Sequence, residues 1–221
     1  MKGMRGVLWD MDGVLVSTGE FHFQAWSKTL AEYEVPFTRE QFRATFGMNN
    51  ARILDVLLEG SPAPELVAEI SERKEVLFRR SVKGQARLLP GVREWLDRCA
   101  ARGVKQAIAS SAPPANIDVL VDELGIRAYF AAIVSGDELP GKPDPAVFLK
   151  AARSIGVAPE RCVVVEDAMA GVEAAKRGGM KCIAVTTTNP AEVLKAADII
   201  VRSLDELAPE KFERLWPEMG E

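Results

Sequence analysis

The sequence contains few cysteines and almost no histidine. Its 221 residues include three cysteines and a single histidine. Cys99, Cys162 and Cys182 lie far apart, and no two of them form a Cys-x-x-Cys pair. Neither a disulfide framework nor a thiolate metal site is therefore expected. Reduced thiols are typical of cytoplasmic proteins, and we expect that location.

A long apolar run and a strong charge of one sign are also lacking. The chain contains no run of about 18 apolar residues, so no membrane-spanning helix is expected. Asp10 interrupts the first apolar stretch before the core of a signal peptide could form. The net charge of -4 is spread over both halves of the chain without long like-charge runs. We therefore expect neither a membrane nor a nucleic acid as a partner.

What is present is the composition of an ordinary globular protein, with 48% apolar and 27% charged residues. A chain of this length can bury one sizeable core, or one core that carries a smaller inserted domain. No internal repeat or low-complexity tract appears.

Near the N-terminus, a short apolar stretch leads directly into two carboxylates. Residues 7–9 are predicted to form a buried strand, and Asp10, Asp12 and Gly13 follow it. If the strand ends between the two aspartates, both side chains can line one cleft. Their repulsion favours a divalent cation or unequal protonation. A surface turn would explain the same residues, and this segment alone does not decide between the two interpretations.

Between this strand and residue 88, the apolar spacing predicts four helices and no strand. Thr38 and Gln41 form a capping box that opens the second helix. About 70 residues of helix are too many for a single crossover between strands, so we expect an inserted domain. The helices are predicted near residues 21–33, from residue 38, at 50–58 and at 63–82.

After residue 88, short apolar runs alternate with helical segments. This alternation predicts an α/β fold, a Rossmann-like parallel sheet with helices on both faces. We expect residues 1–16 and 88–221 to form this core domain and residues 17–87 the helical insert. Strands are predicted at residues 105–109, 131–134, 162–165, 182–185 and 199–201, and helices at 92–102, 115–124, 145–155, 171–177 and near the C-terminus.

Polar residues stand at the carboxyl ends of several predicted strands, where sites in parallel sheets lie. Ser110 ends one strand, Glu166 and Asp167 follow another, and Lys142 lies in a Gly-Lys-Pro-Asp-Pro loop before a helix. Taken singly, Ser110 could cap the next helix, Lys142 could lie in an exposed turn, and the acidic pair could cap the helix at Gly171. These separate structural explanations would all have to be true at once. We therefore favour the interpretation that the residues form one common site.

Four segments in this order resemble the motifs of the haloacid dehalogenase superfamily, and the resemblance spans the whole chain. The helical insert resembles its C1 cap, and residues 20–26 are similar to the first cap segment of the β-phosphoglucomutase-like subgroup. The segments are Asp10-Met11-Asp12-Gly13-Val14-Leu15, the strand end at Ser110, the Gly141-Lys142-Pro143-Asp144-Pro145 loop and Val165-Glu166-Asp167-Ala168-Met169-Ala170-Gly171.

The resemblance and the residue chemistry agree on a mechanism of phosphoryl transfer. Asp10 would attack phosphorus and form an aspartyl-phosphate. Asp12 would protonate the leaving oxygen and later take a proton from the attacking water. Mg²⁺ would be held by Asp10, the backbone carbonyl of Asp12 and Asp167, with Glu166 bound directly or through water.

Other residues are expected to hold the transferring phosphate oxygens, because this reaction depends on positioning and charge neutralisation. We expect Ser110, Ser111 and Lys142 in this role. Asn116 either helps them or is a residue of the helix surface. The resemblance implies that dehalogenases lack the second aspartate, and Asp12 is present here.

His22 and the segment after Gly47 bear on the choice between phosphatase and mutase. The resemblance implies that His22 gates Asp12 as the cap closes, although it could instead pack among the aromatic residues around it. In the mutase subgroup an arginine follows the cap glycine and holds a distal phosphate. Asn50 stands at that position here, and Arg52 does not share its helix face.

We therefore expect a Mg²⁺-dependent phosphatase that acts on a small phosphomonoester, a sugar or polyol phosphate, with Gly47, Asn50 and His22 contributing to substrate binding. A β-phosphoglucomutase-type sugar-phosphate mutase is the alternative. A catalytically idle binding module is a third possibility, but its mark would be the loss of a motif residue, and none is lost. The expected partner is a small phosphorylated metabolite. We expect a monomer, although the sequence carries no direct signal of oligomeric state.

Overall fold

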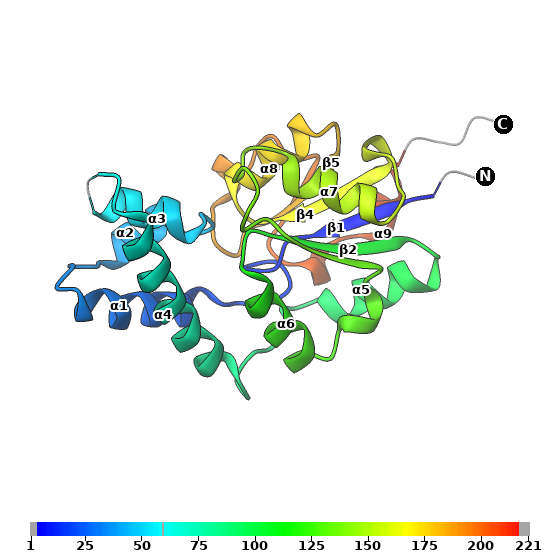
Figure 1. Ribbon diagram of the computed structural model, residues 1–221. Coiled ribbons are helices and arrows are strands. Elements are labelled where there is room, and N and C mark those ends of the chain that lie inside the picture. Colours follow the sequence, from blue (N-terminus) through cyan, green and yellow to red (C-terminus); the bar gives the residue numbers. More distant parts are fainter. Residues whose placement is uncertain (1–3, 59, 217–221) are drawn as a thin grey trace.

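The computed structural model describes residues 4–58 and 60–216. Figure 1 shows a sheet covered by helices, with the helices of the insert beside it. Six parallel strands form the sheet in the order β3-β2-β1-β4-β5-β6. They are β1 (Gly6–Trp9), β2 (Lys105–Ser110), β3 (Ala132–Ser135), β4 (Cys162–Glu166), β5 (Lys181–Val185) and β6 (Ile199–Val201).

Strand β1 lies at the centre of the sheet, between β2 and β4. Its last residue is in register with Ile108 of β2 and Val165 of β4. Asp10, Ser110 and Glu166 therefore lie together at the carboxyl ends of three neighbouring strands. The strand order reverses at β1, and ligands of open α/β sheets bind at such a switch point.

Apolar side chains of β1 point alternately to the two faces of the sheet, as expected for a strand. Val7 and Trp9 pack in one apolar cluster and Leu8 in the other. Helices α5 and α6 lie on one face, and α7 and α8 on the other (Figure 1). The helices of this part are α5 (Val92–Ala101), α6 (Pro114–Glu123), α7 (Ala146–Ser154), α8 (Met169–Arg177) and α9 (Pro209–Glu213).

The four-helix insert forms the cap. Its small apolar cluster contains Trp26, Leu30 and Leu54. The predicted capping box of Thr38 and Gln41 is present at the start of the second helix. The cap helices are α1 (Gly19–Glu32), α2 (Arg39–Thr45), α3 (Asn50–Leu57) and α4 (Pro64–Val82).

The expected fold class, a Rossmann-like core with an inserted four-helix cap, is confirmed. The two connections between cap and core lie side by side, because Val16 and Leu88 form an antiparallel bridge. The division at residues 16/17 and 87/88 is compatible with this bridge and stays a prediction. Within the described residues, no helix is both long and apolar enough to cross a membrane.

Candidate active site

Three buried carboxylates meet at the ends of β1 and β4. Asp10 follows β1, Glu166 ends β4 and Asp167 comes next. One carboxylate oxygen from each lies within 4.8 Å of the others. Such a set of oxygen ligands fits a hard divalent cation, which would balance the negative charge that the fold gathers here.

Burial and mutual repulsion change the protonation of this cluster. Burial raises the pKa of Asp10 to about 7, with the charge of Lys142 opposing the rise and that of Glu166 adding to it. Burial also raises the pKa of Asp167 well above its ordinary value, and the charges of Glu166 and Asp10 raise it further. Both directions are those expected for buried carboxyl groups that repel one another.

Lys142 supplies one positive charge to the cluster. Its Nζ atom lies 2.6 Å from Asp10 Oδ1 and 2.5 Å from Glu166 Oε1. Burial would lower the pKa of Lys142, but the two carboxylates raise it above its ordinary value, so the side chain stays protonated. The side chain is only 7% exposed, which excludes the exposed-turn alternative.

The backbone and a neighbouring loop hold Glu166 and Asp167 in place. Glu166 Oε2 accepts hydrogen bonds from the N–H groups of Asp167 and Ala168, at 2.8 and 2.9 Å. The Thr188 hydroxyl donates to Asp167 Oδ2, and Asn189 donates to the Asp167 backbone carbonyl. Helix α8 begins beyond this pair without a side-chain cap, so the acidic residues do not cap it.

Thr188 and Asn189 were missed in the sequence analysis. They lie in the loop after β5, at the same edge of the sheet as the carboxylates. The signal was present, because a predicted strand is followed there by a polar run from Thr186 to Asn189.

Ser110 lies beside the carboxylate cluster at the end of β2 and is 1% exposed. Its hydroxyl accepts a hydrogen bond from the N–H group of Ala112, and α6 begins later without a side-chain cap. Ser110 therefore does not cap that helix. Ser110 and Ser111 line a cavity together with Asp10 and Lys142.

This cavity has a volume of about 540 Å³ and separates the cap from the carboxyl ends of the strands. Gly47, Met48 and Arg52 of the cap line it, opposite the carboxylate cluster of the core. Asn50 lines an adjoining cavity beside Asp12 and His22, and its Nδ2 atom donates to Glu75 Oε1 at 2.7 Å. The sequence argument that residues 50 and 52 do not share a face agrees with this arrangement, and it is Arg52 that faces the cavity.

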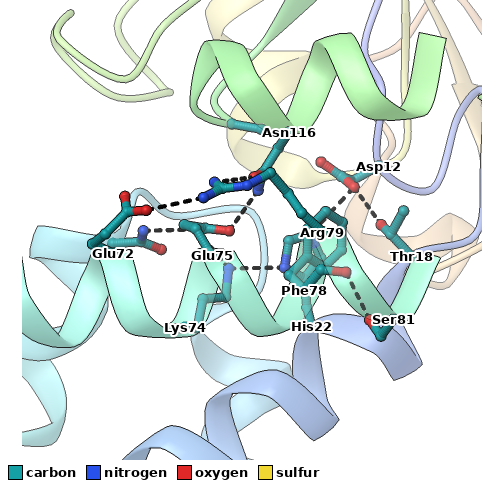
Figure 2. A network of polar contacts seen from close by, with 12 residues as sticks. Asp12, Thr18, His22, Glu72, Lys74, Glu75, Phe78, Arg79, Ser81 and Asn116 are labelled. Atoms are coloured by element: carbon teal, nitrogen blue, oxygen red, sulfur yellow. Dashed lines mark hydrogen bonds and ion pairs between the residues drawn. The ribbon is translucent and has the colours of Figure 1, made fainter. Parts of the chain in front are cut away.

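Asp12 lies in different surroundings from Asp10. The Thr18 hydroxyl donates to Asp12 Oδ1, and His22 Nε2 lies 3.4 Å from the same oxygen (Figure 2). Burial would raise the pKa of Asp12, but the hydrogen bonds and charge of His22, with the Thr18 bond, lower it. The pKa values of Asp10 and Asp12, the two aspartates of one motif, are thus shifted in opposite directions.

His22 connects Asp12 to the buried cation of Lys74. Its ring is stacked on Phe78 with the centroids 3.9 Å apart, and its Nδ1 atom lies 2.9 Å from Lys74 Nζ. Burial and the Lys74 charge lower the pKa of His22, which favours a neutral ring that donates from Nε2 and accepts at Nδ1. The aromatic contacts described for the His22 ring are with Phe78 and Phe46, which lie on other segments than α1.

The structure places Asn116 away from the expected phosphate site. Its side chain is fully buried, which also excludes a position on the helix surface. Its amide Nδ2 donates to Glu75 Oε2 at 2.5 Å, and its Oδ1 accepts from Arg79 at 3.2 Å. The reason for the difference is that α6 turns this residue toward the cap helix α4, and not toward the end of β1.

The chain combines a Rossmann-like sheet, a helical cap after the first strand, and a carboxylate cluster joined to a lysine. Together these features define a class of hydrolases. The chain belongs to the haloacid dehalogenase-like hydrolase family, whose sequence model matches residues 4–179. The family expected from the sequence motifs, and with it the enzyme class, is confirmed. A divalent metal is used by hydrolases of this family, and the acidic cluster is where this chain would hold it.

Similar proteins include both phosphatases and mutases. The chain is 34% identical to 5-amino-6-(5-phospho-D-ribitylamino)uracil phosphatase of Arabidopsis thaliana, over 93% of this chain but only 56% of that protein. It is 33% identical to the phosphorylated carbohydrates phosphatase of Thermotoga maritima, over 81% of this chain and 84% of that one. The crystal structure of β-phosphoglucomutase from Clostridium difficile is 25% identical, with a TM-score of 0.87 over 96% of each chain.

Proposed function

We propose that the chain is a Mg²⁺-dependent phosphatase that hydrolyses a small sugar or polyol phosphate through an aspartyl-phosphate. The observation that carries the proposal is the opposite environment of the two aspartates. Asp10 lies in the carboxylate and lysine cluster, whereas Asp12 is held apart by Thr18 and His22. Unequal environments for two carboxyl groups are typical of a nucleophile beside a general acid and base.

The residues around Asp10 suit the first chemical step. Asp10 Oδ attacks phosphorus, the bond to the leaving oxygen breaks, and Asp12 donates its proton to that oxygen. The Lys142 ammonium group and Ser110 hold the phosphoryl oxygens. Mg²⁺, when bound by Asp10, Asp167, the Asp12 carbonyl and Glu166, would neutralise the phosphate and carboxylate charges.

Asp12 also carries the second step, in which water attacks the aspartyl-phosphate. The carboxylate of Asp12 takes a proton from the water, the bond between phosphorus and Asp10 breaks, and phosphate leaves. The lowered pKa of Asp12 favours its ionised form, which is the form that takes a proton from the attacking water.

A sugar-phosphate mutase is the second candidate, and the position of Arg52 favours it. A mutase has to hold a bisphosphorylated intermediate by both ends, and Arg52 lines the cavity opposite Lys142. No hydrogen bond or ion pair within the described residues engages its guanidinium group. Asn50, where the mutase arginine would stand, is engaged by Glu75, and hydrolysis therefore stays the first choice.

Turnover of p-nitrophenyl phosphate with Mg²⁺ tests the enzyme proposal, and we expect Asp10→Asn to abolish it. A folded, metal-loaded sample without any turnover would instead support an idle binding module. To separate phosphatase from mutase, β-glucose 1-phosphate is incubated with catalytic glucose 1,6-bisphosphate. Glucose 6-phosphate that accumulates faster than free phosphate would contradict hydrolysis as the main activity. A panel of phosphorylated sugars, polyols and nucleotides would then identify the substrate.

The remaining expectations belong to this proposal. A monomeric enzyme of the reducing cytoplasm, with the domain division given above, would keep its three cysteines as thiols. All three are free and buried, which supports this location. Its partner would be a phosphorylated metabolite, in agreement with the phosphatase of phosphorylated carbohydrates among its relatives.

A further inference from the structure

Glu75 is a buried carboxylate that the proposed mechanism does not use. It lies on α4 next to Lys74 and is 3% exposed. Its Oε1 atom accepts hydrogen bonds from Lys74 Nζ and Asn50 Nδ2, each at 2.7 Å. A carboxylate buried this deeply has to be paired, and these two donors occupy only one of its oxygens.

The other oxygen of Glu75 is bound by the core. Asn116 of α6 donates to Glu75 Oε2 at 2.5 Å, and its carbonyl accepts from Arg79 of α4. Figure 2 shows Asn116 reaching from α6 into the polar side chains of α4. Both polar atoms of the fully buried Asn116 side chain are therefore held by the cap helix α4.

The same carboxylate orders the groups that lead to Asp12. Glu75 holds Lys74 Nζ, which lies 2.9 Å from His22 Nδ1, and His22 Nε2 lies 3.4 Å from Asp12 Oδ1. Lys74 is 2% exposed, so its ammonium group depends on these partners for solvation. A change in the position of Glu75 would displace Lys74 and, through it, the His22 ring.

We propose that Glu75 and Asn116 form a clasp that holds the cap on the core and positions Lys74 and His22 against Asp12. Glu75 is thus a positioning residue, and Asn116 is its anchor in the core. The clasp also engages the Asn50 amide, and Asn50 lines the adjoining cavity beside Asp12. The kinetic part of this inference rests on the proposed phosphatase function, whereas the geometric part does not.

An exchange of the two polar groups tests the clasp. Asn116→Asp places two carboxylates together, and Glu75→Gln removes the charge that holds Lys74. We expect each single variant to lose about tenfold or more in kcat/KM, the equivalent of one hydrogen bond to a charged group. In the double variant the introduced amide at position 75 donates to the introduced carboxylate at position 116, which still accepts from Arg79. We expect this variant to recover most of the loss caused by Asn116→Asp, while the part of the loss that comes from the missing charge beside Lys74 stays.

Glu72→Gln is the matched control. Glu72 lies on the same helix and binds Arg79, but it is 70% exposed and has no contact with Asn116 or Lys74 among the interactions described. We expect its kcat/KM to be unchanged. If positions 75 and 116 were not coupled, the double variant would be no better than the single ones, because two independent disruptive substitutions would add.

A distance measurement tests the clasp without turnover. Spin labels at Lys28→Cys on α1 and Arg153→Cys on α7 report the separation of cap and core by pulsed electron paramagnetic resonance. Both positions are exposed, whereas the three native cysteines are buried and should resist labelling. We expect Asn116→Asp to lengthen and broaden the distance distribution and the double variant to restore it.

The outcomes separate this inference from the proposed function. If the exchange restores neither kcat/KM nor the distance distribution, or if Asn116→Asp changes neither, the clasp is contradicted. If the wild type hydrolyses no phosphomonoester, the proposed function fails, and the distances alone still decide on the clasp. Thermal unfolding of each variant identifies one that does not fold, and the remaining single variant and the double variant then carry the test.

Discussion

Asp10 and Asp12 are two residues apart, yet the fold gives them opposite electrostatic environments. Asp10 directly follows a central strand, and burial together with the neighbouring carboxylates raises its pKa to about 7. Asp12 lies beyond the strand end, where His22 and Thr18 stabilise its ionised form. The division of roles that we propose for them, nucleophile and proton carrier, thus follows from where the strand stops.

Lys142 is the residue whose loss should affect the chemistry most directly. We predict that Lys142→Met lowers kcat/KM by about 100-fold or more, because the methionine side chain fills the space but cannot stabilise the phosphoryl oxygens. Steady-state kinetics with p-nitrophenyl phosphate measures the loss. Lys150→Met is the matched control on the exposed side of α7, and equal losses in both variants would contradict the prediction.

Side-chain partners of the cap residues are only partly predictable from the sequence. Lys74 stands at the apolar spacing of α4, between Ile70 and Phe78, and this position on a buried face was a usable signal. Glu75, next to it, looks like any solvated charge in the sequence. Its partner Asn116 lies 41 residues away on another helix, and no local pattern encodes such a contact.

Helix α8 shows how an element leaves room for the site. Gly171 lies in its first turn, and a Cβ atom there would collide with the Glu166 carboxylate. Gly13 has a φ of 81°, and a Cβ atom there would collide with the Asp167 carboxylate. The glycines of the first and fourth motifs therefore allow close approach to the acidic cluster.

We predict that Gly171→Ala weakens Mg²⁺ binding although alanine favours helices. Alanine would stabilise an unhindered helix by about 1 kcal/mol relative to glycine. Here its methyl group has to displace Glu166, so the apparent Kd for Mg²⁺ should rise by about tenfold, measured by isothermal titration calorimetry. An unchanged Kd together with a higher unfolding temperature would show that the carboxylate adapts at no cost.

Strands and long helices could be predicted to within about two residues, because apolar periodicity defines them. The capping box at Thr38 and Gln41 marked the start of α2 correctly. Single 3₁₀ turns such as Arg127–Tyr129 and Pro159–Arg161 were missed, since three residues carry no period. The carboxyl ends of the strands were therefore located well enough to bring the motif residues together.

At the scale of the whole molecule, the cap and the core meet around a cavity. The sequence predicts that an insert is present, but not how it lies on the sheet. That arrangement depends on buried polar contacts such as Glu75 with Asn116 and His22 with Asp12, which join residues of separate elements. The same geometry decides that Arg52 lines the cavity at the carboxylate cluster, whereas Asn50 lines the adjoining cavity beside Asp12.

The core buries several carboxylates around one lysine. Such a cluster suits the proposed function but lowers the stability of the folded protein. Asp167 is 3% exposed, and its raised pKa means that its negative charge destabilises the folded, metal-free protein. We predict that Asp167→Asn raises the unfolding temperature of the metal-free protein at pH 8 by about 2–4 °C, which corresponds to roughly 1 kcal/mol.

The response to Mg²⁺ should reverse this order. In the wild type, bound cation stabilises the folded state by about 2.7 kcal/mol at a concentration 100 times its Kd, whereas Asp167→Asn should show almost no shift. Differential scanning calorimetry with and without Mg²⁺ measures both effects, and Asp55→Asn on the exposed face of α3 is the control. A variant that is less stable than the wild type without metal, or that still responds fully to Mg²⁺, would show that Asp167 serves the packing of the core. A variant that is more stable than the wild type without metal and no longer responds to Mg²⁺ would show that the fold keeps this carboxylate for the cation at the expense of its own stability.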